Sequence, residues 1–368
     1  MTDSVDLLFR PFSAGNLELD NRLVMAPMTR SLSPGGIPND DVAAYYRRRA
    51  EGGTGLLITE GTTVDHDVAS MDPDNIPLFH GTEALAGWKN VVNEVHAAGG
   101  KIMPQLWHVG MARNPSKTPN PEAASAGPSG LVLPGKKVAE PMSEAEVEYV
   151  INAFADAAES AKAIGFDGVE IHGAHGYLID QFFWSGTNIR DDAWAGGIEE
   201  RARFGVEIVK AIRHRVGADF PVVLRFSQWK QQDYDAKLAN TPEELERFLK
   251  PLDEAGVDVF HCSTRRFWLP EFEGSDLNLA GWTKKLLGKP TITVGSVGLD
   301  QDFMGAFAGQ SADHASLDNL LERLANDEFD LVGLGRVLLS DSEWPNKVRN
   351  GQIDQLIPFT KAALAKLA

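Results

Sequence analysis

The feature that most constrains the fold is the recurrence of eight short apolar runs, separated by stretches with the residue spacing of helices. Apolar residues are nearly continuous within each run, as in parallel strands that are covered on both faces. Eight such strands with intervening helices predict an α/β fold, a closed (β/α)8 TIM barrel. The predicted strands are Leu23–Thr29, Thr54–Gly61, Lys101–Trp107, Gly168–His172, Pro221–Ser227, Val257–Thr264, Pro290–Ser296 and Leu331–Arg336.

The helical stretches carry start and stop signals. Ser143 and Thr241 are each followed three residues later by a glutamate, which is the pattern of a capping box, and Pro242 stands at the first helical position. Apolar residues then recur at helical spacing until a glycine closes each stretch. These signals predict helices that end near Gly165 and Gly256.

Three segments exceed what a minimal barrel needs. Leu8–Asp20 contains a Gly-Asn turn and predicts a hairpin across the bottom of the barrel. His108–Pro141, after the third strand, is rich in proline, glycine and serine, and loops of this length usually act as lids or binding elements. Ser263–Leu279 is a second long loop at the face where barrel enzymes place their active sites. We expect one domain over residues 1–368.

Charge and cysteine content exclude several classes of protein. The formal net charge of −17 argues against nucleic acid or an anionic membrane as a partner, because both require a basic face. Cys262 is the only cysteine, so no internal disulfide, cysteine zinc cluster or iron–sulfur cluster can form. The N-terminus lacks the pattern of a signal peptide, and no apolar run is long enough to span a membrane. We expect a cytoplasmic protein, monomeric or homodimeric, that acts on a small molecule.

Arg225 lies inside an apolar predicted strand, where a charged side chain is costly to bury unless a partner satisfies it. One interpretation is a structural pair with an interior carboxylate such as Glu170. The other is that Arg225 faces an electron-rich ligand at the mouth of the barrel. Both remain open from the residues alone.

The fourth strand runs directly into His172, His175 and Tyr177. Two histidines could hold a metal ion, although a metal site needs further ligands. At the carboxyl end of a barrel strand they could instead donate hydrogen bonds that polarise a carbonyl oxygen. The tyrosine hydroxyl could then deliver a proton.

Polar residues and glycines also stand at the ends of the third predicted strand and of the last two. Gln105 and Trp107 share one face of the third strand, where the amide could contact the edge of a heterocycle, while the indole could line a pocket or simply pack. The last two strands end in glycines that can approach an anion closely, and an arginine could bind phosphate oxygens. The phosphate-site candidates are Gly295, Ser296, Gly335 and Arg336.

These residues and their order resemble the Old Yellow Enzyme family of FMN-dependent ene-reductases. The resemblance covers nearly the whole chain, and the stretch HGAHGYLIDQF is highly specific. The matching stretches are NRLVMAPMTR (Asn21–Arg30), QLWHVG (Gln105–Gly110), HGAHGYLIDQF (His172–Phe182), the strand that contains Arg225, VGSVG (Val294–Gly298), LVGLGR (Leu331–Arg336) and EWPNKVR (Glu343–Arg349).

The resemblance implies a role for each matching position. It implies an FMN site with NADH or NADPH as reductant, formed by Pro27, Met28, Thr29, Gly61, Gln105, His172, Arg225, Gly295, Ser296, Gly335 and Arg336. It places Arg225 beside the negative charge of the reduced ring and makes Tyr177 the proton donor. His172 and His175 would bind the carbonyl or nitro oxygen of the substrate. The implied substrate pocket consists of Trp107, His172, His175 and Tyr177, and we add Phe267 and Trp268 from the loop after the sixth strand.

The chain departs from the family pattern at some positions. Asp191–Gly197 replaces the common stretch TDEYGGS, and Met111 stands where many relatives have arginine. Thr29 places the chain nearer to the threonine-bearing members than to the cysteine-bearing branch. We expect Cys262 to be buried rather than redox-active.

Alternative functions would make different demands on the same residues. A metal-dependent barrel hydrolase would use His172 and His175 as ligands, but the chain lacks the other ligands that such an enzyme needs. A Schiff-base aldolase needs a lysine in the barrel mouth, and Lys230 is expected beyond the fifth strand. A flavin-binding protein without turnover would not need Tyr177, His172 and His175. A nitroester or nitroaromatic reductase would use the same flavin site.

Overall fold

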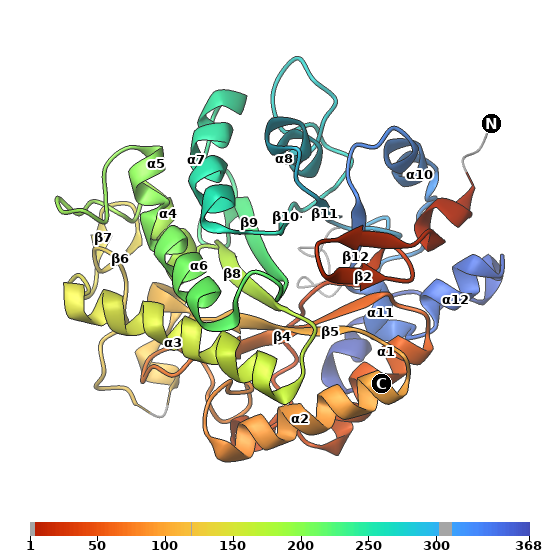
Figure 1. Ribbon diagram of the computed structural model, residues 1–368, viewed down its shortest axis with the longest axis horizontal. Helices are drawn as coiled ribbons and strands as arrows, with labels where there is room; N and C mark the ends of the chain where they lie inside the picture. The colour runs from red at the N-terminus through yellow and green to blue at the C-terminus, as the bar shows by residue number, and fades with distance from the viewer. Residues whose placement is uncertain (1–3, 119, 302–310) are drawn as a thin grey trace.

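Eight parallel strands close into a barrel in the computed structural model, which describes residues 4–118, 120–301 and 311–368 (Figure 1). Neighbouring strands follow one another in chain order around the barrel, and the last pairs with the first. The predicted barrel is therefore confirmed. Its strands are β3 (Leu23–Met25), β4 (Leu56–Thr63), β5 (Ile102–Trp107), β8 (Val169–His175), β9 (Val222–Lys230), β10 (Val259–Ser263), β11 (Thr291–Val294) and β12 (Leu331–Leu334).

Three strands extend further than the sequence indicated, and β4 does so to Thr63. β8 continues to His175 and β9 to Lys230, because these two residues pair with each other beyond an irregularity that follows Gly173. Lys230, which was expected beyond the strand, is therefore its last residue. The extensions of β8 and β9 reach the carboxyl-terminal mouth of the barrel, where they bring further side chains to the site.

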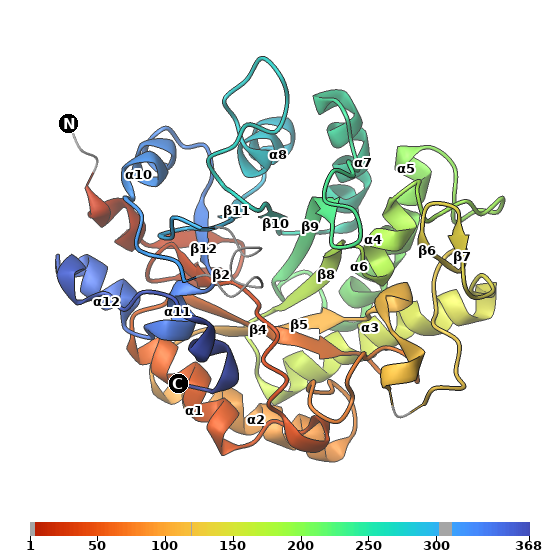
Figure 2. The same ribbon diagram turned by 180° about the vertical axis from the view of Figure 1, so that it is seen from behind.

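Helices surround the barrel and cover the outward faces of its strands (Figures 1 and 2). The longer helices are α1 (Asp40–Glu51), α2 (Thr82–Ala97), α3 (Glu144–Ile164), α6 (Arg203–Val216), α7 (Pro242–Ala255), α8 (Leu279–Leu287) and α10 (Asp318–Ala325). The shorter ones are α4 (Leu178–Phe183), α5 (Ile198–Arg201), α11 (Val337–Ser340) and α12 (Trp344–Arg349). No helix among the described residues has the length and apolar character that crossing a membrane requires.

The predicted caps are present at both helix starts. The Ser143 hydroxyl accepts a hydrogen bond from the Glu146 N–H, and the Thr241 hydroxyl accepts one from the Glu244 N–H, each at 3.2 Å. The helices end at Gly165 (φ 98°) and Gly256 (φ 114°), in the left-handed conformation that glycine adopts without a steric cost.

The predicted hairpin closes the bottom of the barrel. Strands β1 (Phe12–Ala14) and β2 (Leu17–Leu19) pair antiparallel, and the hairpin is drawn in red in Figure 1. Phe12, Leu17 and Leu19 pack against the innermost apolar side chains of the barrel strands, such as Val24 and Met103. Because this end is plugged, a ligand can enter only from the opposite face.

The long loop after β5 contains the antiparallel strands β6 (Leu131–Leu133) and β7 (Lys136–Lys137) (Figure 2). It is tied to α4 by Gln181, whose side-chain oxygen accepts a hydrogen bond from the Met111 N–H at 3.1 Å. The same amide donates to the Gly176 carbonyl at 2.6 Å. The loop thus lies beside the turn that carries the two histidines, and its function as a lid stays a prediction. The remaining short elements are the 3₁₀ helices η1 (Val5–Phe9), η2 (Pro34–Gly36), η3 (Gly110–Ala112), η4 (Pro115–Lys117), η5 (Ile353–Gln355) and η6 (Lys361–Ala365).

Candidate active site

A chain of buried polar groups crosses the barrel interior. Gln105 donates a hydrogen bond from Nε2 to Glu170 Oε1 at 2.8 Å, and Glu170 Oε2 lies 2.6 Å from His261 Nδ1. The Glu170 and His261 side chains are both fully buried. Each carboxylate oxygen of Glu170 has a partner other than Arg225, and no hydrogen bond or ion pair joins Glu170 to Arg225 among the described residues.

Arg225 has few protein partners for a buried cation. Its Nη2 donates to Ser263 Oγ at 3.3 Å, and its buried Nε has no hydrogen-bond partner. Burial lowers the pKa of Arg225, while the nearby charge of Glu170 raises it. An arginine normally remains protonated in proteins, so this guanidinium presents a positive charge with unused donors at the barrel mouth. That arrangement favours the ligand interpretation.

Four aromatic side chains cluster beside Arg225, whose strand partner is His172. The ring centroid of His172 lies 5.1 Å from that of His175, 5.0 Å from that of Tyr177 and 6.0 Å from that of Trp107. Trp107 meets Tyr177 edge-on at 4.9 Å. The structure thus brings together the four residues that the sequence assigned to the substrate pocket, and all of them are buried.

The turn after β8 has an unusual backbone that fixes the second histidine. His175 has φ 66°, a conformation that costs roughly 1–3 kcal/mol for a residue other than glycine. Its N–H donates to Ser227 Oγ at 3.0 Å, and its Nε2 lies 2.7 Å from Ser263 Oγ. Ser263 therefore joins His175 to Arg225, and strained backbone of this kind is common at functional sites.

Burial sets the protonation of these groups. It lowers the pKa of both His172 and His175 well below the usual value, and the charge of Arg225 lowers them further. Burial raises the pKa of Tyr177 to about 12, against smaller opposing effects of Gln231 and Arg225. At neutral pH the site therefore holds neutral imidazoles, each with an N–H to donate, and a phenol that keeps its proton.

His108, just after β5, is another buried histidine with a lowered pKa, and its pKa can be tested through the stability of the protein. Burial lowers its pKa well below the usual value, whereas the unfolded chain titrates near about 6.5. The contribution of His108 to the unfolding free energy is therefore fully present above about pH 6.5. It is lost as the pH falls toward the folded-state pKa, because only the unfolded state takes up the proton in this range. We expect His108→Asn to reduce the loss of unfolding free energy between about pH 7.5 and 5.5 by about 1 kcal/mol.

Urea denaturation of the holoprotein at the two pH values measures this difference. His214→Asn is the control, since it makes the same substitution at a histidine that is exposed on α6. An equally steep loss in the parent protein and in His108→Asn would contradict the prediction.

The segment after β3 is the one at which the resemblance predicts the edge of the flavin. Pro27 and Met28 are partly exposed and Thr29 is exposed. The buried Glu60 carboxylate holds the following turn, since its Oε2 accepts hydrogen bonds from the N–H groups of Arg30 at 2.8 Å and Ser31 at 3.1 Å. Burial raises the pKa of Glu60 to about 7.

Gly61 follows Glu60 and is required by the packing of Trp107. A Cβ atom at this position would lie 2.5 Å from Trp107 Cε3, so any side chain would displace the indole. The glycine keeps this indole beside the site residues of β8.

The predicted phosphate site also comes together. Gly295 (φ 148°) and Ser296 (φ 54°) turn sharply after β11, and Arg336 Nη2 donates to Ser296 Oγ at 3.3 Å. A Cβ atom added to Gly335 would meet only Met28 Sδ, at 3.8 Å, so the space beside this glycine is open. The Ser296 hydroxyl itself donates to the Arg265 carbonyl at 3.0 Å, so the guanidinium and the open glycine backbone are the groups that can receive an anion.

Phe267 and Trp268 occupy the loop after β10. Phe267 belongs to the main hydrophobic core, Trp268 packs against that core, and the two rings meet edge-on at 5.3 Å. Phe267 N–H donates to the Gly295 carbonyl, so this loop supports the predicted phosphate site. Their place in the substrate pocket stays a prediction. Cys262, at the end of β10, is fully buried, and burial raises the pKa of its thiol to about 12, as an unreactive cysteine requires.

Sequence reasoning missed Ser263, Trp229 and Gln231, which contact the site residues. Trp229 stacks on His175 with ring centroids 4.6 Å apart, and Gln231 Nε2 donates to the Tyr177 hydroxyl at 2.9 Å. Side chains alternate along a strand, so Trp229, four positions after Arg225, could have been assigned to its face if the strand had been extended to Lys230. Ser263 lies on β10 and Gln231 follows β9, so this signal does not reach them.

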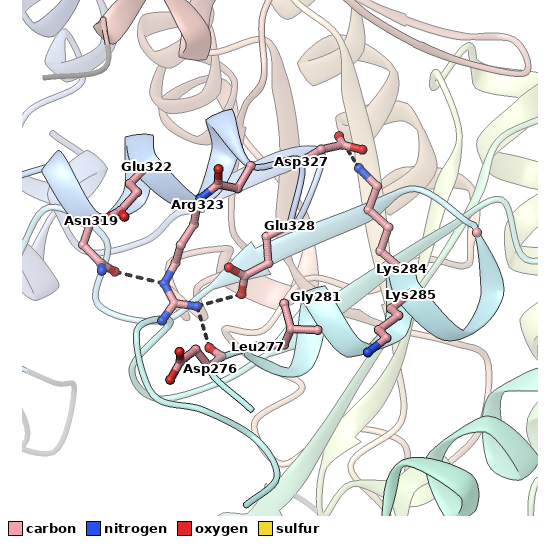
Figure 3. A pocket seen from close by; sticks show the side chains of 12 residues that line it. Asp276, Leu277, Gly281, Lys284, Lys285, Asn319, Glu322, Arg323, Asp327 and Glu328 are labelled. Atoms are coloured by element: carbon pink, nitrogen blue, oxygen red, sulfur yellow. Dashed lines mark hydrogen bonds and ion pairs between the residues drawn. The ribbon is translucent and has the colours of Figure 1, made fainter. Parts of the chain in front are cut away.

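A surface hollow of about 770 Å³ between α8 and α10 is separate from this site (Figure 3). Four of its charged groups pair with one another, Lys284 with Asp327 at 2.6 Å and Arg323 with Glu328 at 2.7 Å. None of the predicted site residues lines it. We assign it to helix packing on the outside of the barrel.

The alternatives from the sequence can be compared with this geometry. Within the described ranges, no three histidine, cysteine, aspartate or glutamate side chains form a group that could hold a metal ion. Lys230 lies near the barrel mouth, as a Schiff-base enzyme would need, but it is fully buried and its Nζ lies 2.6 Å from Asp180 Oδ1. An enclosed and ion-paired ammonium is a poor nucleophile.

Comparison with known proteins agrees with the site. Residues 7–355 match the model of the NADH:flavin oxidoreductase / NADH oxidase family. The chain is 34% identical to an NADH oxidase of Thermoanaerobacter brockii, over 95% of this chain and 52% of that protein. It is also 34% identical to a cinnamate reductase of Clostridium sporogenes, over 97% of this chain and 55% of that protein.

A solved structure extends the likeness to three dimensions. Morphinone reductase in complex with tetrahydroNAD superposes with a TM-score of 0.79 and 27% sequence identity, over 98% of this chain and 97% of that one. The chain spans about half the length of the first curated relatives it matches, and about nine tenths of several others.

Proposed function

Because this chain belongs to the NADH:flavin oxidoreductase / NADH oxidase family, the family of the Old Yellow Enzymes, we propose that it reduces activated carbon–carbon double bonds. FMN is the cofactor of this family and NADH or NADPH is its reductant. The substrates would be α,β-unsaturated carbonyl or nitro compounds. Residues 1–368 would form a single FMN-binding domain. The observation that carries the proposal is the Arg225 guanidinium, whose Nε has no hydrogen-bond partner among the described residues, at the same barrel mouth as the His172, His175 and Tyr177 cluster.

The residues present fit FMN at both of its ends. A buried Arg225 with unused donors suits the electron-rich pyrimidine edge of the ring. Arg336 and the open backbone at Gly335 suit the phosphate. Gly335 adjoins Met28, so the predicted flavin edge and phosphate site are continuous. Pro27, Thr29, Gly61, Gln105, Gly295 and Ser296 would complete the contacts.

When bound, FMN supplies a two-electron carrier that accepts hydride from NAD(P)H and delivers it to the β-carbon of the substrate. The protein supplies the remaining steps. His172 and His175 are neutral and would donate hydrogen bonds to the substrate oxygen, where negative charge develops in the transition state. Tyr177 keeps its proton at neutral pH and would transfer it to the α-carbon. Trp107 and the buried surroundings would exclude water from the site.

A visible absorbance spectrum of the purified protein tests the proposal. We expect a yellow protein that bleaches when NADPH is added and regains its colour under anaerobic conditions when cyclohexenone follows. The saturated ketone should form in an amount equal to the flavin reoxidised. A colourless protein that cannot be reconstituted with FMN would contradict the cofactor assignment, and bleaching without anaerobic recovery would contradict the reaction.

A further inference from the structure

Three consecutive residues at the end of β9 approach the proposed catalytic groups from one side. Trp229 stacks on His175 with an interplanar angle of 27°, and its indole N–H donates to the Ser263 carbonyl at 3.2 Å. The Gln231 N–H donates to the His175 carbonyl at 3.2 Å. The backbone and the indole therefore hold His175 from two directions.

Between these two residues, Lys230 points the other way and is fixed by a buried ion pair. Lys230 Nζ lies 2.6 Å from Asp180 Oδ1, both side chains are fully buried, and Nζ also donates to the Ser227 carbonyl at 3.2 Å. Asp180 Oδ2 accepts a hydrogen bond from the Gly176 N–H at 2.7 Å. The pair thus connects the end of β9 to the turn between His175 and Tyr177.

Gln231 makes the one hydrogen bond to the Tyr177 hydroxyl that is found among the described residues. Its amide Nε2 donates to Tyr177 Oη at 2.9 Å. A donor of this kind stabilises a phenolate more than a phenol, because hydrogen bonds to ionised groups are stronger. The positive charge of Arg225 also favours the phenolate form of Tyr177. The neighbouring His172 is neutral and adds no charge.

We propose that Gln231 is a further catalytic residue that stabilises the phenolate left on Tyr177, and that the buried Lys230–Asp180 pair is a positioning element that holds it there. The inference rests on the proposed function. In the step concerned, the O–H bond of Tyr177 breaks and its proton forms a C–H bond at the α-carbon of the substrate. The electron pair stays on Tyr177 Oη, where Gln231 donates to it, and solvent later returns the proton. The hydride comes from reduced FMN.

Rapid mixing of the reduced holoenzyme with cyclohexenone tests the role of Gln231. We expect Gln231→Leu to slow flavin reoxidation about tenfold, the loss of one hydrogen bond to a charged group, while reduction by NADPH stays unchanged. Gln231→Glu should be slower still at neutral pH and should recover in acid, as its carboxylate protonates. In a Tyr177→Phe background, Gln231→Leu should have no further effect. The inference would be overturned if Gln231→Leu slowed flavin reduction and reoxidation equally. It would also be overturned if Gln231→Leu slowed reoxidation about tenfold in the Tyr177→Phe background.

A second readout does not depend on turnover. The chain has five tyrosines, so ¹³Cζ-labelled tyrosine gives few NMR signals, and Tyr177→Phe assigns the relevant one. Gln231→Leu should shift the Tyr177 signal and leave the other four in place. An unshifted signal would overturn the contact itself. If instead Tyr177→Phe reoxidised at the parent rate, the proposed proton donor would be wrong, a result distinct from failure of the Gln231 variants alone.

The ion pair is tested by replacing both partners together, because a single change would leave a buried charge and could prevent folding. We expect Asp180→Asn with Lys230→Met to retain FMN and the rate of reduction by NADPH, to slow reoxidation several-fold and to shift the Tyr177 signal. Adding Gln231→Leu should slow reoxidation no further than Gln231→Leu alone. If the slowing in the triple variant equalled the product of the slowing caused by the double replacement and by Gln231→Leu, the ion pair would not act through Gln231.

Discussion

Replacing Tyr177 by phenylalanine is expected to slow reoxidation of the reduced enzyme by cyclohexenone by about 100- to 10,000-fold, the usual contribution of a positioned general acid. The phenol is buried, and its pKa is raised to about 12, so it holds its proton at neutral pH. The His172 and His175 rings beside it would bind the oxygen of the same substrate. Phenylalanine keeps the edge-on packing against Trp107, so binding of FMN and reduction by NADPH should not change.

Stopped-flow absorbance separates the two half-reactions and measures this effect directly. Tyr149→Phe is the matched control, because that tyrosine is 53% exposed on α3 and should tolerate the change without any kinetic effect. If Tyr177→Phe lost FMN, or slowed reduction and reoxidation alike, the hydroxyl would have a structural rather than a proton-donating role.

The sequence predicted the barrel because its eight strands are buried on both faces and read as continuous apolar runs. The same reasoning singled out His172, Arg225 and Ser296 as polar residues that interrupt or follow those runs, although β8 and β9 continue past His172 and Arg225. The hairpin was predictable from its Gly-Asn turn, and β1 and β2 pack under the barrel as expected.

The sequence could not predict the ends of β8 and β9. Residues Gln228 to Gln232 are polar apart from Trp229, so they look like a loop, yet pairing of His175 with Lys230 extends both strands. Lys230 is buried only because Asp180, fifty positions away in sequence, neutralises it. Such long-range compensation leaves no periodic pattern, and Gln231 was overlooked for the same reason.

Arg225→Met is expected to have opposite effects on the protein with and without FMN. In the protein alone, the guanidinium is buried and donates only to Ser263, while Glu170 is taken by Gln105 and His261. A buried charge with so few partners is costly. An apolar side chain of similar length should therefore leave the unfolding free energy of the apoprotein unchanged or raise it by about 1–3 kcal/mol.

Binding of FMN should respond in the other direction, because methionine cannot donate hydrogen bonds to the ring. Loss of a charged donor costs about 1.5–3 kcal/mol, so the affinity for FMN should fall about 10- to 150-fold. Titration of apoprotein with FMN, followed by the quenching of flavin fluorescence, measures the affinity, and urea denaturation measures the stability. Arg47→Met, on the outer surface of α1, should change neither the affinity for FMN nor the stability by more than a surface substitution does. A destabilised apoprotein that bound FMN normally would show that Arg225 is a structural residue, whereas the two opposite shifts would show that its charge is held for the flavin.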